Sequence, residues 1–193
     1  MLKEKLNKYN IILASKSPRR QFLLKELGLD FEIRTKDVDE SFPKKLKGKQ
    51  IALYLCKKKA EAFKSELKSN DLLITADTIV WINGKVLNKP ADYNEAVKML
   101  KTLSGKMHAV FTGVSLSTSE KQKKFCCETK VYFKILSSRE INFYVRNYKP
   151  FDKAGAYGAQ EWIGYVGVEK IIGSYFNVMG FPLKELYEEL MKF

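Results

Sequence analysis

Two adjacent arginines mark the first place in this sequence where side chains could bind an anion. Arg19 and Arg20 follow Ser17 and Pro18, a pair typical of a helix start, and apolar residues recur behind them at helical spacing. The helix predicted over 18–27 puts both guanidinium groups in its first turn, where the helix dipole disfavours cations. A bound phosphate would offset that cost, because free backbone N–H groups and two arginines would converge on it. A solvated basic turn explains the local pattern equally well.

A lysine lies within the apolar stripe of the next predicted helix, over 48–67. Ile51, Leu55, Lys59 and Ala62 recur at spacings of four, four and three, which places them on one face. The ammonium group of Lys59 either reaches past its neighbours to solvent or points into a polar site. Taken alone, the spacing favours the first interpretation.

Acidic residues follow two of the predicted strands. Asp77 comes directly after the apolar strand 71–76, and the carboxyl ends of strands in α/β sheets face the crevice in which ligands bind. A carboxylate there can hold a divalent metal ion or activate a water molecule. The alternative for Asp77 is a turn-forming role, in which it accepts hydrogen bonds from the backbone that follows. Asp39 and Glu40 form a second acidic pair that could share a cation, although a solvated loop is the favoured local interpretation.

Two further segments carry groups that suit a nucleotide. Lys89 follows a predicted hairpin, and its ammonium group would stand at the mouth of the site that Asp77 faces. In the segment 151–160, glycine and alanine let the backbone approach a ligand closely, and the amide of Gln160 can both donate to and accept from a base edge. His108, the single histidine, has no nucleophile pattern near it, which favours a structural role. Together the cations and the acid indicate phosphoryl chemistry on a polyphosphate.

The composition indicates one globular domain over residues 1–193. Of these residues 45% are hydrophobic and 12% aromatic, which is enough for a single well-packed core. No apolar run approaches the roughly 18 residues that a membrane-spanning helix needs, and the first residues lack the core of a signal peptide. We therefore expect a cytoplasmic protein without a membrane partner. The three cysteines show no metal-ligand spacing and are expected as reduced thiols.

The net charge of +13 leaves a second class of function open. Such a charge attracts nucleic acids and other polyanions, so a basic nucleic-acid-binding protein without catalytic activity is the main alternative to an enzyme. However, the lysines are scattered, and the sequence has no basic tail, no helix-turn-helix pattern and no basic strands with interleaved aromatic residues. Nucleic acid is therefore a disfavoured partner.

The order of the predicted elements indicates a mixed α/β fold. Strands are predicted over 10–15, 31–35, 71–76, 107–117, 125–136 and 175–179. A hairpin is predicted over 80–87, because its Asn-Gly turn tolerates positive φ angles. Helices are predicted over 18–27, 48–67, 92–103 and 138–147 and after Pro182. The glycine-rich stretch 150–167 is expected to be an ordered loop, and the order of the strands in the sheet is left open.

Several blocks of this sequence closely resemble, in the same order, the motifs of the Maf protein family. They are LASKSPRR from Leu13, ADTIV from Ala76, NKP from Asn88, LSGKMH from Leu103, DKAGAYGAQ from Asp152 and GSYFNVMGFPL from Gly173. The resemblance implies a nucleoside triphosphate pyrophosphatase that uses a divalent metal cation, Mg²⁺ or Mn²⁺, to form a monophosphate and pyrophosphate. It also implies a fold like that of inosine triphosphate pyrophosphatase, an elongated twisted mixed β-sheet with flanking helices and two lobes around a central cleft.

The resemblance assigns roles to individual positions. Asp77 matches the catalytic acid of the family and Glu40 matches an acidic residue of its site, which makes both of them candidate metal ligands. The residues that match the triphosphate-facing positions are Ser15, Arg19, Arg20, Lys59 and Lys89, and Lys59 is also a catalytic candidate.

Three positions resemble the branch of the family that acts on dTTP and UTP. They are Arg19, Thr78 and Gln160, and the branch that acts on 7-methyl-GTP carries other residues there. The implied role is house-cleaning of nucleoside triphosphates, modified pyrimidine nucleotides included. Glu161 departs from the pattern, since glycine usually follows the glutamine. A division-regulating role is an alternative suggested by the family name alone, and the expectations include a homodimer.

Overall fold

The computed structural model describes all residues from 1 to 193 and contains one seven-stranded mixed sheet with flanking helices. The strands are β1 (Asn10–Leu13), β2 (Glu32–Ile33), β3 (Asp71–Ile82), β4 (Lys85–Leu87), β5 (Met107–Ser117), β6 (Gln122–Phe133) and β7 (Val168–Ile172). The α-helices are α1 (Leu2–Lys5), α2 (Pro18–Glu26), α3 (Lys49–Glu61), α4 (Tyr93–Leu103), α5 (Ser138–Tyr148), α6 (Trp162–Gly167), α7 (Tyr175–Val178) and α8 (Leu183–Met191). Two 3-10 turns complete the chain, η1 (Lys64–Glu66) and η2 (Ala154–Ala156). The predicted α/β class is confirmed.

The strand order of the sheet is β2-β1-β3-β5-β6-β7, and β4 also pairs with β3. Strand β1 runs parallel to both β2 and β3, with Leu13 beside Ile33 and Ile74. The β3–β4 and β6–β7 pairs are antiparallel. The sheet therefore mixes the connections of a parallel βαβ unit with those of hairpins.

The chain divides into two compact units. Unit 1 comprises Met1–Asp77, Thr112–Cys127 and Gly180–Phe193, and unit 2 comprises Thr78–Phe111 and Glu128–Met179. The long strands β3, β5 and β6 each contribute residues to both units. In β3 the division falls between Asp77 and Thr78.

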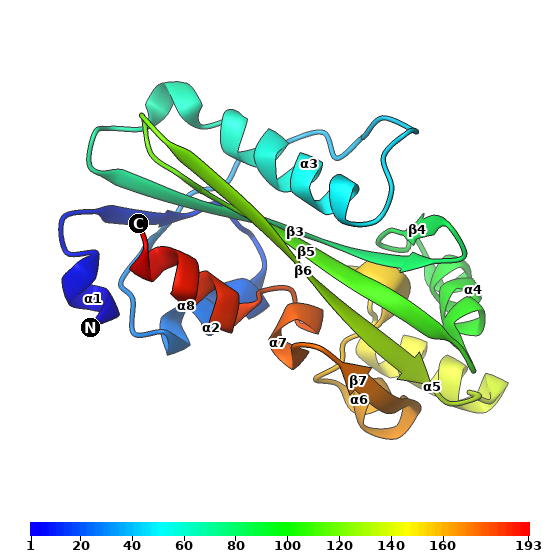
Figure 1. Ribbon diagram of the computed structural model, residues 1–193. Helices are drawn as coiled ribbons and strands as arrows, with labels where there is room; N and C mark the ends of the chain where they lie inside the picture. Colours follow the sequence, from blue (N-terminus) through cyan, green and yellow to red (C-terminus); the bar gives the residue numbers. More distant parts are fainter. The chain divides into compact units, whose positions relative to one another are not determined.

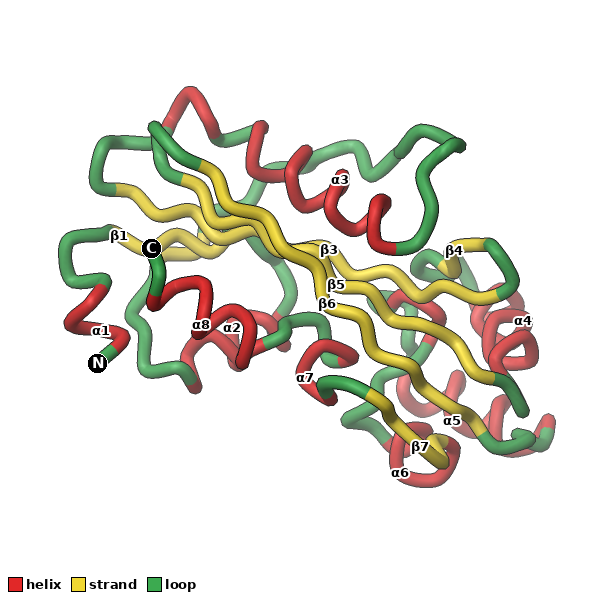
Figure 2. The backbone as a smooth tube through the Cα atoms, in the orientation of Figure 1, coloured by secondary structure: helices red, strands yellow, loops and turns green.

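Unit 1 covers its strands with helices on both faces. Helix α3 lies on one side of the strands, and α1, α2 and α8 lie on the other (Figures 1 and 2), where α1 packs against α8. The C-terminal part of α3 buries Ala60 against Ile12 and Leu73 of two neighbouring strands, together with Phe63. This packing orients α3 on β1 and β3.

Unit 2 is built around α4, which packs against α5 and η2. Local signals begin both helices as expected, since Asp92 accepts a hydrogen bond from the backbone of Glu95 and Ser137 forms a capping box with Glu140. His108 is buried in this core, where its Nε2 lies 2.7 Å from the hydroxyl of Tyr157. Burial lowers the pKa of His108 to about 4, and this buried position agrees with the structural role that the sequence favours.

Some predicted element bounds are wrong. The segment 175–179 is not a strand but contains α7, because the side chain of Ser174 caps that helix. The last strand is β7, and the expected loop 150–167 contains η2 and α6. Helix α3 ends at Glu61, short of the predicted residue 67, and β2 is reduced to two residues. Strand β3 continues through Asp77 to Ile82, because its last residues pair with β4 in the Asn-Gly hairpin.

None of the helices combines the length and the apolar composition that crossing a membrane requires.

Candidate active site

The centre of the candidate site is a lysine held between two carboxylates of unit 1. The ammonium Nζ of Lys59 lies 2.5 Å from Oδ1 of Asp77 and 2.7 Å from Oε1 of Glu40. The side chains of Lys59 and Asp77 are 19% and 9% exposed, whereas that of Glu40 is 48% exposed. The favoured interpretation of Lys59 as a solvent-reaching side chain is therefore wrong. Its ammonium group points into a polar cluster on the face of α3 that meets the sheet.

Two contacts between α3 and the sheet set the position of Lys59. The buried hydroxyl of Thr75 donates a 2.7 Å hydrogen bond to the backbone carbonyl of Cys56, one turn before the lysine. Thr75 and Asp77 lie on the same face of β3, because side chains alternate along a strand. Gly113 of β5 provides the second contact, since a Cβ there would lie 2.9 Å from the backbone nitrogen of Leu53 and closer still to Ala52. The helix can approach the sheet this closely only over a glycine.

Arg20 joins the same cluster through the backbone. Its Nε donates to the carbonyl of Gly180 at 2.8 Å, and its Nη1 donates to the carbonyl of Ala76 at 2.9 Å. One arginine thus ties the first turn of α2 to the strand residue before Asp77 and to the segment before α8. Burial lowers the pKa of Arg20, and the charge of Asp77 opposes that shift.

The electrostatic balance at Asp77 follows from burial and from these neighbours. Burial raises the pKa of Asp77 above its ordinary value, and the positive charges of Lys59 and Arg20 oppose that effect. The negative charge of Glu40 adds to the increase. The result is a buried carboxylate whose proton affinity exceeds that of an exposed aspartate, which suits a general base.

The residues before α2 form the other part of the site in unit 1. The buried Ser15 follows β1, and its Oγ accepts a 3.2 Å hydrogen bond from the backbone N–H of Ser17. The amide of Gln21 donates to the carbonyl of Ser15 at 3.1 Å, which closes the turn. Arg19 lies in the first turn of α2, as predicted, and is half-buried.

The second acidic pair separates in the structure. Asp39 accepts from the ammonium group of Lys58 at 2.9 Å and from both the backbone and the hydroxyl of Ser41. These hydrogen bonds hold the pKa of Asp39 well below its ordinary value. Glu40 turns instead to Lys59. Asp39 lies in an exposed loop, as the favoured local interpretation predicts, and Glu40 is exposed in the same loop but pairs with Lys59.

Three of the predicted site residues belong to unit 2. Thr78 is half-buried and directly follows Asp77 in β3, Lys89 is exposed after β4, and Gln160 is half-buried after η2. The backbone N–H of Gly155 donates to the carbonyl of Asn88 at 3.1 Å, which links the segment of Lys89 to η2. With a φ of +70° and the side chain of Val80 3.0 Å from where its Cβ would be, Gly155 is a position that only glycine suits.

A network of buried polar groups supports the segment of Gln160. Tyr144 donates from its hydroxyl to Glu161 and accepts a 3.0 Å hydrogen bond from the backbone of Gly158. The ammonium group of Lys153, whose side chain is 9% exposed, lies 3.1 Å from Glu161 and 2.7 Å from Asp152. Sequence reasoning gave no role to Tyr144 or Lys153. In the sequence they are only a tyrosine on the apolar face of α5 and a lysine in a glycine-rich segment. Their role can be recognised only in the structure, where the two segments contact each other.

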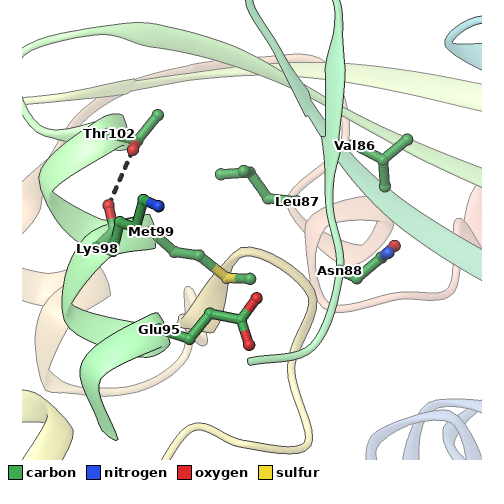
Figure 3. Close-up of a pocket in the computed structure, with 7 residues that line it drawn as sticks. All are labelled: Val86, Leu87, Asn88, Glu95, Lys98, Met99 and Thr102. Atoms are coloured by element: carbon green, nitrogen blue, oxygen red, sulfur yellow. Dashed lines mark hydrogen bonds between the residues drawn. The ribbon is translucent and has the colours of Figure 1, made fainter. Parts of the chain in front are cut away.

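A separate hollow on unit 2 lies between α4 and the strand β4 (Figure 3). It has a volume of about 240 Å³ and is lined by Val86, Leu87, Asn88, Glu95, Lys98, Met99 and Thr102. None of the predicted site residues lines it, although Asn88 precedes Lys89. The candidate site is therefore defined by the side-chain clusters and not by this hollow.

Comparison with known proteins gives the fold and then the family. The fold resembles that of the Staphylococcus aureus Ham1 protein, with a TM-score of 0.54 over 95% of this chain and 98% of that one at 16% sequence identity. The family model described as Maf-like protein matches residues 10–193. The chain therefore belongs to the Maf family.

Relatives of high identity extend over nearly the whole chain. A dTTP/UTP pyrophosphatase of Bacteroides thetaiotaomicron is 56% identical over 188 residues, which are 97% of each chain. A dTTP/UTP pyrophosphatase of Flavobacterium johnsoniae is 53% identical over 190 residues, which are 98% of each chain.

Proposed function

We propose that this protein is a nucleoside triphosphate pyrophosphatase that hydrolyses dTTP and UTP to the monophosphate and pyrophosphate. The relatives with this name support the activity and the substrate, because they match nearly the full length of the chain. The observation that carries the proposal is the buried Asp77, held with Glu40 by Lys59 and flanked by Arg20. The activity removes triphosphates from the nucleotide pool, and we place it in the cytoplasm.

In the proposed mechanism Asp77 is the general base. It takes a proton from a water molecule, whose oxygen forms a bond to the α-phosphorus of the nucleotide. The bond between the α-phosphorus and the bridging oxygen breaks, and pyrophosphate leaves with that oxygen. The raised pKa of Asp77 brings its proton affinity closer to what proton abstraction at neutral pH requires.

The cations around Asp77 would neutralise charge that develops on the phosphate oxygens. Lys59 and Arg20 are already fixed by the fold, so they need no reorganisation when the transition state forms. Ser15 and Arg19 lie at the N-terminal turn of α2, and they would bind phosphate oxygens together with the free N–H groups of that turn. Lys89 is the phosphate-facing candidate from unit 2.

A divalent cation fits the donors that the site offers. The carboxylates of Asp77 and Glu40 offer hard oxygen ligands, and both contact the ammonium group of Lys59. No third carboxylate, histidine or cysteine joins them. Magnesium is commonly held by one or two carboxylates together with phosphates of the substrate, which matches this set. A bound cation of this kind would neutralise negative charge on the phosphates.

We assign recognition of the base to Arg19, Thr78 and Gln160, the three positions that resemble the branch of the family acting on dTTP and UTP. Gln160 is suited to this role because its amide carries both a donor and an acceptor. Variants of Thr78 and Gln160 should change the preference among bases more than the turnover of the preferred base.

The experiment that tests this function is a measurement of pyrophosphate release from a panel of nucleoside triphosphates with Mg²⁺ or Mn²⁺. We expect turnover of dTTP and UTP by the wild-type chain. In the Asp77→Asn variant kcat should fall by about 10²–10⁴-fold, the usual contribution of a general base, while nucleotide binding is largely retained.

Two results would contradict the proposal. Near-normal turnover by the Asp77→Asn variant would show that Asp77 is not the general base. Absence of turnover of any nucleotide, together with tight and salt-sensitive DNA binding, would instead support a nucleic-acid-binding protein. Binding of a non-hydrolysable nucleotide to both forms serves as the control for folding.

A further inference from the structure

The amide of Gln160 by itself does not explain a preference for thymine and uracil over cytosine. Thymine and uracil present an acceptor, O4, beside a donor, N3–H, whereas cytosine presents an amino donor beside the acceptor N3. A glutamine amide has a donor side and an acceptor side, and a half-turn of the amide exchanges them. Gln160 can therefore pair with either edge unless its amide is held in one orientation. This inference rests on the proposed function.

A carboxylate lies next to that amide. A Cβ on Gly158 would lie 3.0 Å from Nε2 of Gln160, 3.0 Å from Oε2 of Glu161 and 2.8 Å from Cδ of Glu161. The amide nitrogen of Gln160 and the carboxylate of Glu161 therefore both lie beside the backbone of Gly158, where a side chain would contact each of them. All three residues belong to unit 2.

The carboxylate of Glu161 is itself held on two sides. Tyr144, whose side chain is fully buried, donates its hydroxyl to one oxygen, and Lys153 lies 3.1 Å from the other. The same tyrosine hydroxyl accepts from the backbone N–H of Gly158 at 3.0 Å. The carboxylate of Glu161 is therefore held by a tyrosine that also binds the backbone two residues before Gln160.

The main chain of Gln160 is also fixed. Its carbonyl accepts a hydrogen bond from the hydroxyl of Tyr165, and the backbone N–H of Glu161 donates to the carbonyl of Gly158 at 3.0 Å. These main-chain hydrogen bonds leave the orientation of the side-chain amide open. A carboxylate only accepts hydrogen bonds, so it favours the orientation that turns Nε2 toward itself and Oε1 away.

We propose that Glu161 is a positioning residue that fixes the amide of Gln160 in one orientation and thereby makes the site discriminate thymine and uracil from cytosine. Tyr144 and Lys153 hold the carboxylate in place, and the backbone of Gly158 lies beside both the carboxylate and the amide.

The test is the Glu161→Gln variant, with kcat/KM measured for dTTP against dCTP and for UTP against CTP. Within each pair the sugar and the triphosphate are the same, and a ratio within one preparation does not depend on the folded fraction. A neutral amide at position 161 both donates and accepts, so Gln160 can turn. We expect each preference to fall several-fold, because no carboxylate then favours one orientation of the amide, mainly through a lower KM for the cytidine nucleotides.

Two further variants separate this role from a structural one. Glu169→Gln removes the same charge from an exposed position of unit 2 and should leave both ratios unchanged. Tyr144→Phe keeps the carboxylate and its ion pair with Lys153, so it should lower the melting temperature while shifting the ratios less than Glu161→Gln.

The outcomes are distinct. Unchanged ratios in Glu161→Gln would overturn the inference while turnover of dTTP leaves the proposed function standing. A fall of the ratios in Glu169→Gln as large as in Glu161→Gln would show that they follow the lost charge and not the position of Glu161, and would also overturn it. If the wild-type chain hydrolyses none of the four nucleotides, the proposed function fails and this inference fails with it.

Discussion

At the scale of single residues, the charges around Asp77 set the pH at which the candidate site can work. A general base must be deprotonated, and burial raises the pKa of Asp77 above its ordinary value of 3.8. The value of kcat/KM should therefore fall as the pH drops through this raised pKa, at a higher pH than an exposed aspartate would give. Lys59 lowers the pKa and Glu40 raises it, so the two neighbours act in opposite directions.

Substitution of these two neighbours should move the acid limb of the pH profile in opposite directions. Lys59→Met removes the positive charge and should shift the limb to higher pH by about one unit. Glu40→Gln removes the negative charge and should shift the limb to lower pH. The profile of kcat/KM for dTTP measures both, because it reports pKa values of the free enzyme. A shift of both variants in the same direction would contradict the role of Asp77 as the titrating base.

At the scale of elements, the approach of α3 to the sheet determines whether Lys59 meets Asp77. Helix α3 lies against Gly113 of β5, and its Cys56 carbonyl accepts a hydrogen bond from the hydroxyl of Thr75 in β3. Neither residue carries chemistry, yet both fix the distance between the lysine and the strand. Arg20 has the equivalent function for α2, since it binds the carbonyls of Ala76 and Gly180.

The Gly113→Ala variant should push α3 away from the sheet. A methyl group there collides with the backbone of Ala52 and Leu53, so we expect a loss of about 1–3 kcal/mol of unfolding free energy, as for overpacked cores. We also expect a lower kcat, because Lys59 moves with the helix. Chemical denaturation and dTTP turnover measure the two effects.

Gly28→Ala is the matched control for that variant. Gly28 has a φ of +73° and open space around its Cα, so alanine is strained there without meeting a neighbour. It should lower stability while leaving kcat unaltered. Equal kinetic losses in both variants would show that the effect of Gly113→Ala comes from stability and not from the position of α3.

At the scale of the whole molecule, three long strands contribute to both units. Since β3, β5 and β6 continue from one unit into the other without a linker, unfolding either unit breaks strands of both. We therefore expect the chain to unfold in one cooperative transition.

The positions of the two tryptophans allow a direct test of that expectation. Trp81 and Trp162 both lie in unit 2, so their fluorescence reports this unit, whereas far-ultraviolet circular dichroism reports both units. The two thermal transitions should coincide. A fluorescence transition separated from the circular dichroism transition would show that the units unfold independently, against the single domain expected from the sequence.

Local signals in the sequence were sufficient for much of the fold. Ser17 and Pro18 begin α2, Asp92 caps α4, and Asn83 and Gly84 turn the hairpin with φ angles of 52° and 75°. Each of these signals acts over a few residues, so the sequence alone reveals it. The prediction fails at 175–179, where apolar residues resemble a strand. There Asn177 is buried in a helix and donates to Val110 and Thr129, far away in the sequence.

The candidate site shows the same division. The sequence by itself determined the residue types, the basic first turn of α2, the acid at position 77 and the motifs that place the chain in its family. Only the tertiary structure decided that Lys59 turns to Asp77, that Glu40 joins it while Asp39 does not, and that Tyr144 and Lys153 hold Glu161. The reason is physical, since a charged side chain takes the partner that the packed helices and strands bring near it. No spacing along one element specifies that partner.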